Sequence, residues 1–513
     1  MTVVAVDDTD SRTEGMCTTY LAARLADRLA DGDCVERRVL VRLFPGVEHK
    51  TRGNAALAVH TDAAPSRARR VVVSLAERFA VTTDADTSPG VVVAPHDPDA
   101  VPEPVASFAR DAIREPVALD RALRVAAEAG YETVGWAPGV GGAGRGTSTD
   151  PASRRVTGRA THVGDASGSR DSAAADSRPA DSAAANSATR DTVAGRGRVG
   201  ALAAVGAWAS HDDWTYERID YRAFDRCGTQ REVDERSVFA AAADAYPDAW
   251  DTVDRVAGEA VCVPNAPGPV LYGVRGDDAT AVERVAARIE SESVDRSALF
   301  VTNQGTDAHL HDARGAWAAG GPVPQTGGHS SLRDGLAYRI DGTVKTAPET
   351  RRGGHVFFAL EPPERGGGGG VAESGEVAGE TPTPAPDALD CVAFEPTGRF
   401  RDRVRALRPG DRLTVCGEVA DDTVKLEKVA VRELDRTERV VPTCPECERT
   451  MESAGRDAGY RCRDCETSES GKVTRTVDRD LRPGWYEVPP CARRHVAKPL
   501  VRGGFDAATH PER

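Results

Sequence analysis

Lysine is almost absent from this chain of 513 residues. Only six lysines occur among the 66 basic residues, so arginine supplies nearly all of the positive charge. Acidic residues number 80, and the formal net charge is −14. An acidic, lysine-poor composition is typical of proteins adapted to high salt, where screening removes much of the self-repulsion. The overall acidity therefore does not exclude a nucleic-acid partner, and local patches of charge have to decide.

The sequence also lacks the segments that mark membrane or secreted proteins. It has no run of about 18 apolar residues, and no charged and then apolar leader precedes the first predicted strand. We therefore expect a cytoplasmic protein without a membrane partner. The 11 cysteines are an odd number, and four of them have metal-binding spacing, so we expect no disulfide framework.

Large apolar residues are scarce in two stretches, at about 147–194 and about 364–388. Neither stretch can bury enough surface to offset the entropy of ordering, so both are predicted to be disordered insertions. The length predicts three or four domains. The sequence around the insertions divides into four blocks: 1–210, 211–318, 319–440 and 441–513.

The blocks differ in the spacing of their apolar residues. The first two alternate strand-like and helical patterns, and the third consists of short strand-like runs between glycine turns, which suits an oligonucleotide-binding barrel. In the first block, residues 70–75 are strand-like, whereas residues 16–31 and 105–129 have helical spacing. The tetrapeptide Ala-Gly-Arg-Gly occurs on both sides of the first insertion, at 143–146 and 194–197. We hypothesise that this insertion expanded inside a glycine-rich loop.

The predicted N-terminal strand ends in three carboxylates. Asp7, Asp8 and Asp10 follow the apolar run at residues 3–6. Carboxylates at the end of a buried strand are costly unless a cation offsets them, and such hard oxygen ligands suit Mg²⁺ carrying phosphate. Thr18 lies at the start of the next predicted helix, where negative charge is favoured. These residues predict a site for a metal-bound nucleotide; the alternative is a solvated turn in which Thr18 or Thr19 caps the helix.

Two further segments contain candidate phosphate-binding residues: Lys50, Arg52, Gly53 and Asn54 in the first, and Gly195, Arg196 and Gly197 in the second. The first would form a clamp of cations and an amide, although a surface turn explains it equally well. The glycines of the second would let backbone amides at a helix N-terminus approach phosphate. The second segment also matches a dinucleotide-binding pattern, but it does not follow a predicted strand, so that interpretation fails.

The C-terminal block contains the strongest metal-binding signal. Its ligands are spaced as two CxxC knuckles: Cys444, Cys447, Cys462 and Cys465. Four thiolates at this spacing predict a tetrahedral Zn²⁺ site in a zinc ribbon, with no open position for catalysis. The alternative is four incidental buried cysteines. The site is expected to be structural or to support nucleic-acid binding.

A basic stretch at residues 472–502 follows the cysteines. It has eight basic side chains against three acidic ones, and Trp485 and Tyr486 lie among them. Cations beside aromatic rings favour contact with phosphates and bases, whereas the alternative is a solvated tail. The candidate contacts are Arg493, Arg494, His495 and Lys498.

Taken in order, these segments resemble one family, the archaeal tRNA-Ile 2-agmatinylcytidine synthetases, also called tRNA-Ile agmatidine synthases. The resemblance covers nearly the whole chain except the two insertions. Its motifs here are Asp7-Asp8-Thr9-Asp10, Gly15-Met16-Cys17-Thr18-Thr19, Lys50-Thr51-Arg52-Gly53-Asn54, Gly195-Arg196-Gly197, Tyr221-Arg222, Gly228-Thr229, Thr302-Asn303-Gln304-Gly305-Thr306-Asp307, Gly353-Gly354-His355, the four cysteines, Arg493-Arg494-His495 and Lys498-Pro499-Leu500. The lysine-poor composition resembles that of a halophilic archaeon.

The resemblance implies a multidomain α+β fold with a kinase-like α/β domain, a ferredoxin-like domain, an oligonucleotide-binding barrel and a C-terminal zinc ribbon. It implies ATP, agmatine and an isoleucine tRNA with a CAU anticodon as partners, and Mg²⁺ and Zn²⁺ as cofactors. The implied enzyme replaces the C2 oxygen of the wobble cytidine by agmatine and cleaves ATP to AMP and phosphates, so that the anticodon reads AUA rather than AUG. The family's autophosphorylated threonine corresponds to Thr18.

The chemistry of the implied reaction is consistent with these residues. Phosphorylating O2 of cytidine would convert a poor leaving group into phosphate, which the amine of agmatine can displace. This route needs Mg²⁺, hydrogen-bond donors around the phosphates and a dry pocket. Two other classes stay open at this point. A non-catalytic tRNA- or DNA-binding protein would not need the acidic loop, and a metal-dependent phosphohydrolase would not need the nucleic-acid modules.

Overall fold

The computed structural model describes residues 1–11, 13, 15–47, 53–137, 195–314, 332–362, 388–456 and 458–513. The first predicted insertion lies outside these ranges, as does nearly all of the second. Lys50 and Arg52 also lie outside them. Within the described ranges, no helix is both long and apolar enough to cross a membrane.

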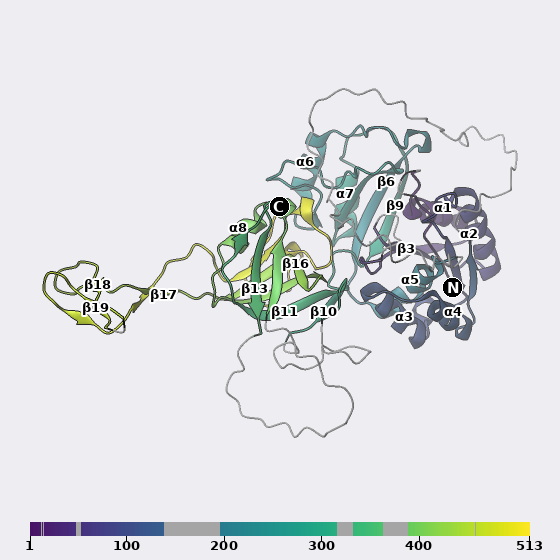
Figure 1. Cartoon of the computed structure of the whole chain (residues 1–513). Helices are drawn as coiled ribbons and strands as arrows, with labels where there is room; N and C mark the ends of the chain where they lie inside the picture. The colour runs from purple at the N-terminus through teal and green to yellow at the C-terminus, as the bar shows by residue number, and fades with distance from the viewer. Residues whose placement is uncertain are drawn as a thin grey trace, which may run out of the picture.

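A nine-stranded sheet organises the N-terminal part of the chain (Figure 1). Its order is β5-β4-β1-β3-β2-β9-β6-β8-β7. The strands are β1 (Thr2–Asp7), β2 (Val35–Arg42), β3 (Ala55–Thr61), β4 (Gly90–Ala94), β5 (Glu132–Gly135), β6 (Thr215–Arg222), β7 (Ala249–Trp250), β8 (Val270–Gly276) and β9 (Val294–Thr302). Neighbours are antiparallel except β2 and β9, which run parallel. This one pair joins strands from block 1–210 to strands from block 211–318.

Helices cover both faces of this sheet. The helices are α1 (Thr18–Ala30), α2 (Pro65–Phe79), α3 (Glu103–Arg114), α4 (Leu119–Glu128), α5 (Arg198–Ser210), α6 (Glu235–Ala245) and α7 (Ala279–Ala286). The alternation of side chains in β1 decides which helix packs where. Val4 and Val6 join the core under α1 and α2, whereas Val3 and Ala5 join the core under α3, α4 and α5. α6 and α7 pack together beside β8.

The expectation that residues 70–75 are strand-like is wrong, because this run lies inside α2. Pro65 occupies the first turn of α2, where its fixed φ favours a helix. Ala68, Val72 and Leu75 recur at helical spacing and are buried against the sheet. Of the three consecutive valines, only Val72 lies fully on this buried face, and Val71 and Val73 are half-buried on either side of it.

A second sheet closes into a five-stranded barrel. The ring runs β11-β13-β14-β16-β15 and back to β11, with only β14 and β16 parallel. The strands of this sheet are β10 (Leu310–Asp312), β11 (Ala337–Val344), β12 (Glu349–Thr350), β13 (Val356–Glu361), β14 (Leu389–Ala393), β15 (Arg412–Ala420), β16 (Thr423–Glu433), β22 (Gly484–Glu487) and β23 (Thr509–His510). α8 (Phe400–Arg405) contributes Phe400 and Val404 to the barrel core.

A small module projects from the barrel and contains the four predicted zinc ligands (Figure 1). Its strands are β17 (Thr437–Val440), β18 (Glu452–Ser453), β19 (Tyr460–Arg461), β20 (Ser468–Glu469) and β21 (Val473–Thr476). β17 pairs with β21, so the chain leaves and re-enters the barrel through one two-stranded stem.

The residues after the ribbon, 484–513, form the C-terminal segment, which connects the barrel to the nine-stranded sheet. β22 pairs with β16 of the barrel. On the other side, Arg502 forms ion pairs with Asp213 at 2.8 Å and Asp277 at 2.6 Å. The segment therefore fixes how the barrel sits against the sheet.

Candidate active site

A cavity of about 400 Å³ lies beyond the carboxyl ends of β1 and β2. β1 and β2 are both antiparallel to β3, so they point the same way and end at the same edge of the sheet. α1 and α5 both begin at this edge. Their N-termini carry partial positive charge, and the volume is in the range of small-molecule sites. The position suits an anionic ligand.

The cavity brings together most of the described residues that the sequence singled out for metal and phosphate chemistry. Its lining includes Asp7, Asp8, Asp10, Thr18, Gly53, Asn54, Arg196 and Gly197. These residues come from four separate segments of the chain, and the fold places them around one space. Lys50 and Arg52 lie outside the described residues, and their phosphate contacts stay a prediction.

Asp7 and Asp8 are desolvated carboxylates at the cavity wall. The pKa of Asp7 is raised well above its ordinary value, mainly by burial and next by the charge of Asp8. Burial also raises the pKa of Asp8 to about 6, although Arg196 opposes the shift. Arg196 Nη2 and the backbone N–H of Ser88 donate to Asp8 Oδ2 at 3.0 and 3.1 Å. One guanidinium thus faces two carboxylates, an arrangement that favours a further cation.

Two glycines let the start of α5 approach the carboxylates closely. A Cβ on Gly200 would lie 2.0 Å from Asp7 Oδ2, and a Cβ on Gly197 would lie 2.6 Å from the Asp7 carbonyl oxygen. Any side chain at either position would displace the helix or the acidic loop. The glycines therefore allow close approach of the backbone to Asp7, and its approach to phosphate stays a prediction.

Gly195 does not line the cavity, but its backbone fixes the segment that leads into α5. Its N–H is 2.9 Å from the Trp136 carbonyl oxygen and 2.9 Å from Ser88 Oγ. The N–H of Arg196 also donates to Ser88 Oγ at 3.1 Å, and the N–H of Gly197 donates to the Ser88 carbonyl at 2.8 Å. The two described residues nearest the first insertion on its two sides, 137 and 195, are therefore held close together.

Thr18 is the first residue of α1 and is 5% exposed. Its Oγ1 accepts a hydrogen bond from Thr9 Oγ1 at 3.1 Å. The N-cap is Cys17, and no side-chain hydrogen bond caps the helix. The alternative in which Thr18 or Thr19 caps the helix is therefore wrong. The Thr18 hydroxyl instead lies at a helix N-terminus, on the wall of the cavity.

Five charged residues that the sequence did not reveal also line the cavity, and three of them, Arg42, Glu217 and Arg275, form one cluster. Arg275 Nε donates to Glu217 Oε1 at 3.1 Å, and Arg42 Nη2 lies 3.7 Å from Glu217 Oε2. Glu217 is 3% exposed, so both arginines help to stabilise its charge. Each residue stands alone in its strand without a motif around it. Only the pairing of β2, β9, β6 and β8 brings them together.

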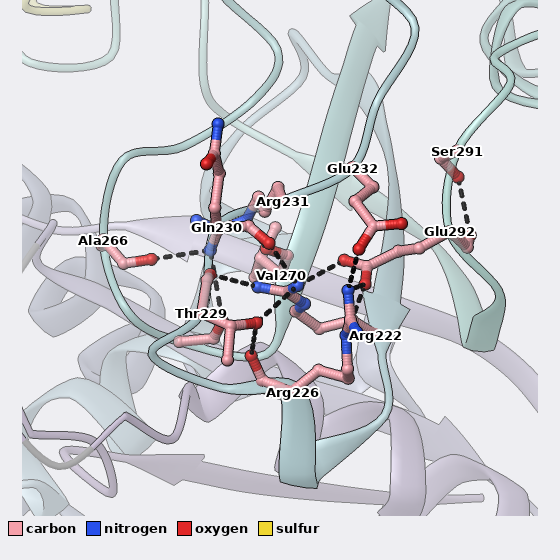
Figure 2. Close-up of polar contacts among 11 residues, drawn as sticks. Arg222, Arg226, Thr229, Gln230, Arg231, Glu232, Ala266, Val270, Ser291 and Glu292 are labelled. Carbon is pink, nitrogen blue, oxygen red and sulfur yellow. Dashed lines mark hydrogen bonds and ion pairs between the residues drawn. The ribbon is translucent and has the colours of Figure 1, made fainter.

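Arginines hold the loop that forms another wall of the cavity (Figure 2). Arg231 donates to the carbonyl oxygens of Val270 at 2.8 Å and Ala266 at 2.6 Å. Arg222 is fully buried, forms an ion pair with Glu292 at 2.6 Å and donates to the Thr229 carbonyl at 2.8 Å. The Arg222–Thr229 bond joins two of the motifs that carry the family resemblance. Both motifs therefore support the cavity wall rather than line it.

The predicted nucleic-acid contacts lie in the C-terminal segment. Arg493 is buried and forms ion pairs with Asp251 at 2.8 Å and Glu487 at 2.6 Å, which gives it a structural role. Arg494 is exposed and pairs with Glu418. Burial lowers the pKa of His495 well below its ordinary value, so this ring is neutral. Contact of Arg493, Arg494, His495 and Lys498 with tRNA stays a prediction.

The four predicted zinc ligands converge. One sulfur from each of Cys444, Cys447, Cys462 and Cys465 lies within 4.8 Å of the others, which fits a tetrahedral Zn²⁺ site. Among the described residues, no other group of three or more potential ligands converges in this way. Asp7, Asp8 and Asp10 line one cavity but do not form such a group of ligand atoms.

Comparison with known proteins shows the family of this chain. The sequence matches the TiaS TCKD domain at residues 3–72, the TiaS FLD domain at 195–309 and the TiaS C-terminal zinc ribbon domain at 441–481. It is 47% identical over 532 residues to TiaS of Haloquadratum walsbyi, a 2-agmatinylcytidine synthetase for an isoleucine tRNA, and the alignment covers 100% of both chains. The chain belongs to the TiaS family.

Solved TiaS structures share the whole fold. The crystal structure of TiaS in complex with its isoleucine tRNA and ATP covers 100% of this chain and 99% of its own, with a TM-score of 0.74 and 33% sequence identity. The complex of TiaS with the same tRNA, AMPCPP and agmatine has a TM-score of 0.71 at 32% identity, with coverage of 100% and 99%. The resemblance read from the sequence motifs is therefore confirmed. The TiaS FLD match begins at residue 195 and so includes α5.

Proposed function

We propose that this protein is an ATP-dependent 2-agmatinylcytidine synthetase that acts on an isoleucine tRNA. It attaches agmatine to C2 of the wobble cytidine in the isoleucine tRNA with a CAU anticodon, so that the tRNA reads AUA. The observation that carries the proposal is the convergence of the acidic loop, Thr18 and the start of α5 on one cavity, in a chain of the TiaS family. A cytoplasmic location belongs to the proposal, since ATP and tRNA are found there.

The phosphates of ATP lie, in this proposal, between the acidic loop and the helix N-termini. Asp7 and Asp8 hold Mg²⁺, because desolvated carboxylates that already repel each other are stabilised by a divalent cation. Bound Mg²⁺ offsets triphosphate charge. Arg196 and the backbone of Gly197 face the same phosphates, and Lys50 and Arg52 complete the clamp. Asp10 orients the metal's ligands.

The proposed reaction activates the C2–O2 bond of cytidine, because its oxygen is otherwise a poor leaving group. Cytidine O2 takes a phosphoryl group from ATP and leaves as phosphate when the amine of agmatine attacks C2. Thr18 accepts a phosphoryl group from ATP, and hydrolysis later releases it as phosphate; while it is attached, the dipole of α1 stabilises its charge. The wobble base has to leave its stack to reach the cavity, which proteins achieve by splaying single-stranded bases.

The barrel and the ribbon hold the rest of the tRNA. We assign the five-stranded ring to an oligonucleotide-binding fold, residues 1–210 to a kinase-like domain and 211–318 to a ferredoxin-like domain. On the barrel, Arg351 and Arg352 are exposed beside β12, and the Arg351 guanidinium lies 4.3 Å from the Phe357 ring centroid. A cation stacked on an aromatic ring is a surface that suits an unstacked base.

Incubation with ATP, labelled agmatine and a transcript of the isoleucine tRNA with a CAU anticodon tests the function. Label is expected on the tRNA, and a transcript with uridine at the wobble position is expected to stay unlabelled. The Asp8→Ala variant should lose transfer while its tRNA affinity changes only several-fold. Loss of ATP without transfer would instead indicate a phosphohydrolase, and tRNA binding alone would indicate a non-catalytic module.

Labelled γ-phosphate tests the role of Thr18. We expect Thr18→Ser to keep phosphate incorporation into the protein and Thr18→Ala to abolish it. Full-rate transfer by Thr18→Ala would show that the hydroxyl only accepts the hydrogen bond from Thr9.

A further inference from the structure

Arg42 ends β2 at the mouth of the cavity, where its guanidinium is partly exposed. A Cβ built on Gly53 would lie 2.8 Å from Arg42 Nη1, so this guanidinium lies against the predicted phosphate clamp. Its neighbour on the other side is Glu217, with a closest approach of 3.7 Å. Arg42 is thus a cation at the position where ATP phosphates are proposed to bind.

Two buried amide side chains fix Arg42. Asn303 bonds both backbone groups of Arg42: its Oδ1 accepts from the Arg42 N–H at 2.7 Å, and its Nδ2 donates to the Arg42 carbonyl at 3.0 Å. Gln304 Oε1 accepts from Arg42 Nε at 2.7 Å. Asn303 is 0% and Gln304 is 2% exposed. The backbone and the guanidinium plane of Arg42 are therefore set by adjacent residues of one loop.

We name residues 302–307 the bracket loop. Its backbone is held from within the sheet, because Thr215 Oγ1 donates to the Gln304 carbonyl at 2.7 Å. Gly305 has a φ of +75°, and a Cβ there would lie 2.4 Å from the Trp250 ring, so the turn requires glycine. These constraints explain why the bracket loop consists largely of polar residues although most of them are buried.

The far end of the bracket loop is bonded to the half of the molecule that is proposed to hold tRNA. Asp307 pairs with Arg339 of barrel strand β11 and accepts from the backbone N–H of Lys498 at 2.8 Å. Arg502 of the C-terminal segment donates to the Gly305 carbonyl at 2.7 Å. Six consecutive residues thus contact Arg42, which lines the cavity, at one end and the barrel with its C-terminal segment at the other.

We propose that the bracket loop couples the seating of tRNA to the binding of ATP, with Gln304 as the positioning residue for Arg42 and Asp307 as the link to the barrel. The inference rests on the proposed function, since it requires Arg42 to contact the phosphates. Linkage makes the coupling reciprocal: tRNA tightens ATP by the same factor as ATP tightens tRNA.

The first test asks whether Gln304 acts through Arg42. Gln304→Met should raise KM for ATP about tenfold with kcat and KM for agmatine little changed, because Arg42 contacts the phosphates before and during the reaction. Gln304→Glu keeps the acceptor and should restore ATP binding. In an Arg42→Met background, Gln304→Met should add nothing further. Additive losses, or equal losses in all kinetic constants, would overturn the positioning role.

The second test measures coupling without the transfer reaction. Affinity for a fluorescent, non-hydrolysable ATP analogue is measured with and without the isoleucine tRNA. We expect tRNA to tighten the analogue at least about fivefold in the natural protein. Asp307→Asn should bring that ratio to about one while affinity without tRNA stays within about twofold. Arg339→Lys removes the planar fork from the other partner and should act in the same direction.

Asp506→Asn is the matched control. Asp506 lies in the C-terminal segment and, like Asp307, pairs with a barrel arginine, in this case Arg432 at 2.9 Å, but it has no bond to the bracket loop. This variant should keep the natural ratio. A ratio of one in the natural protein, or an unchanged ratio in both Asp307→Asn and Arg339→Lys, would overturn the coupling. Because these readouts are binding constants, they separate this outcome from a failure to transfer agmatine.

Discussion

Asp8 titrates near neutrality because burial raises its pKa to about 6. The folded protein therefore keeps this carboxyl protonated between about pH 4 and pH 6, where an unfolded Asp is already charged. Mg²⁺ and Arg196 need the charged form. We expect kcat/KM for ATP to rise as pH rises through about 6, in a profile measured over pH 5–8 at saturating agmatine and tRNA. An acidic limb centred near pH 4 would contradict the assignment.

The same shift makes a prediction about stability. Since the folded state binds the proton more tightly than the unfolded state, the contribution of Asp8 to stability falls as pH rises from about 4 to about 6. In metal-free protein, Asp8→Asn should therefore raise the melting temperature at pH 7.5 relative to the natural protein, and by less at pH 4. Saturating Mg²⁺ should narrow the difference, because only the carboxylate binds the ion.

Gly200 makes the approach of α5 to Asp7 possible. Gly200→Ala would place a methyl group 2.0 Å from Asp7 Oδ2, so the carboxylate or the helix must move. We expect a loss of about 100-fold in ATP-dependent transfer, which corresponds to a few kcal/mol of lost transition-state stabilisation. Gly32→Ala is the control, because its Cβ would meet only Arg67 at 3.5 Å. Equal activity of both variants would show that Asp7 tolerates the shift.

Single residues also show how far the sequence predicts the site. Asp7, Asp8 and Thr18 could be predicted because each follows directly on a strand end or opens a helix, so that local pattern reveals position. Arg42 and Glu217 could not, since their roles depend on the pairing of β2 with β9, whose paired residues lie more than 250 positions apart in the chain, and on the pairing of β9 with β6. The interactions that bury Glu217 are made across strands and leave no local pattern.

Among the structural elements, the loop between β5 and α5 offers a clear test. The N–H of Gly195 bonds to the Trp136 carbonyl at 2.9 Å, so the described residues on either side of the insertion are already close together. We expect a protein lacking residues 147–194 to fold and to transfer agmatine at a rate within about twofold of the full chain, since loop length alone changes closure entropy slowly. Circular dichroism and the transfer assay check this. Loss of folding would assign the insertion a structural role.

Elements with strong periodicity agree with the sequence-based prediction. The helical pattern at residues 16–31 matches α1 closely, and the pattern at 105–129 corresponds to α3 and α4, which Pro116 separates. The prediction that residues 70–75 are strand-like failed because β-branched residues also occur in buried helices. The parallel pairing of β2 with β9 could not be predicted, since long-range pairing is decided by tertiary packing.

At the scale of the whole molecule, the net charge of −14 should make stability depend on salt. The Debye length falls from about 10 Å at 0.1 M to about 3 Å at 1 M salt, so self-repulsion between surface carboxylates weakens. We expect the melting temperature at pH 7.5 to rise with KCl over that range. Near pH 5.4, where the net charge vanishes, the dependence should be much weaker. Equal salt dependence at both pH values would point to ion-specific binding instead.

The unbroken run of strands from β5 to β7 has a mechanical consequence. The ladder continues from β2 into β9 through two residue pairs, Val39 with Val301 and Leu40 with Thr302, and the bonds of Asn303 to the backbone of Arg42 extend this connection. The floor beneath the ligands is consequently one continuous sheet. We therefore expect movement during turnover in the tRNA and in the barrel and ribbon that are proposed to bind it, rather than within this sheet.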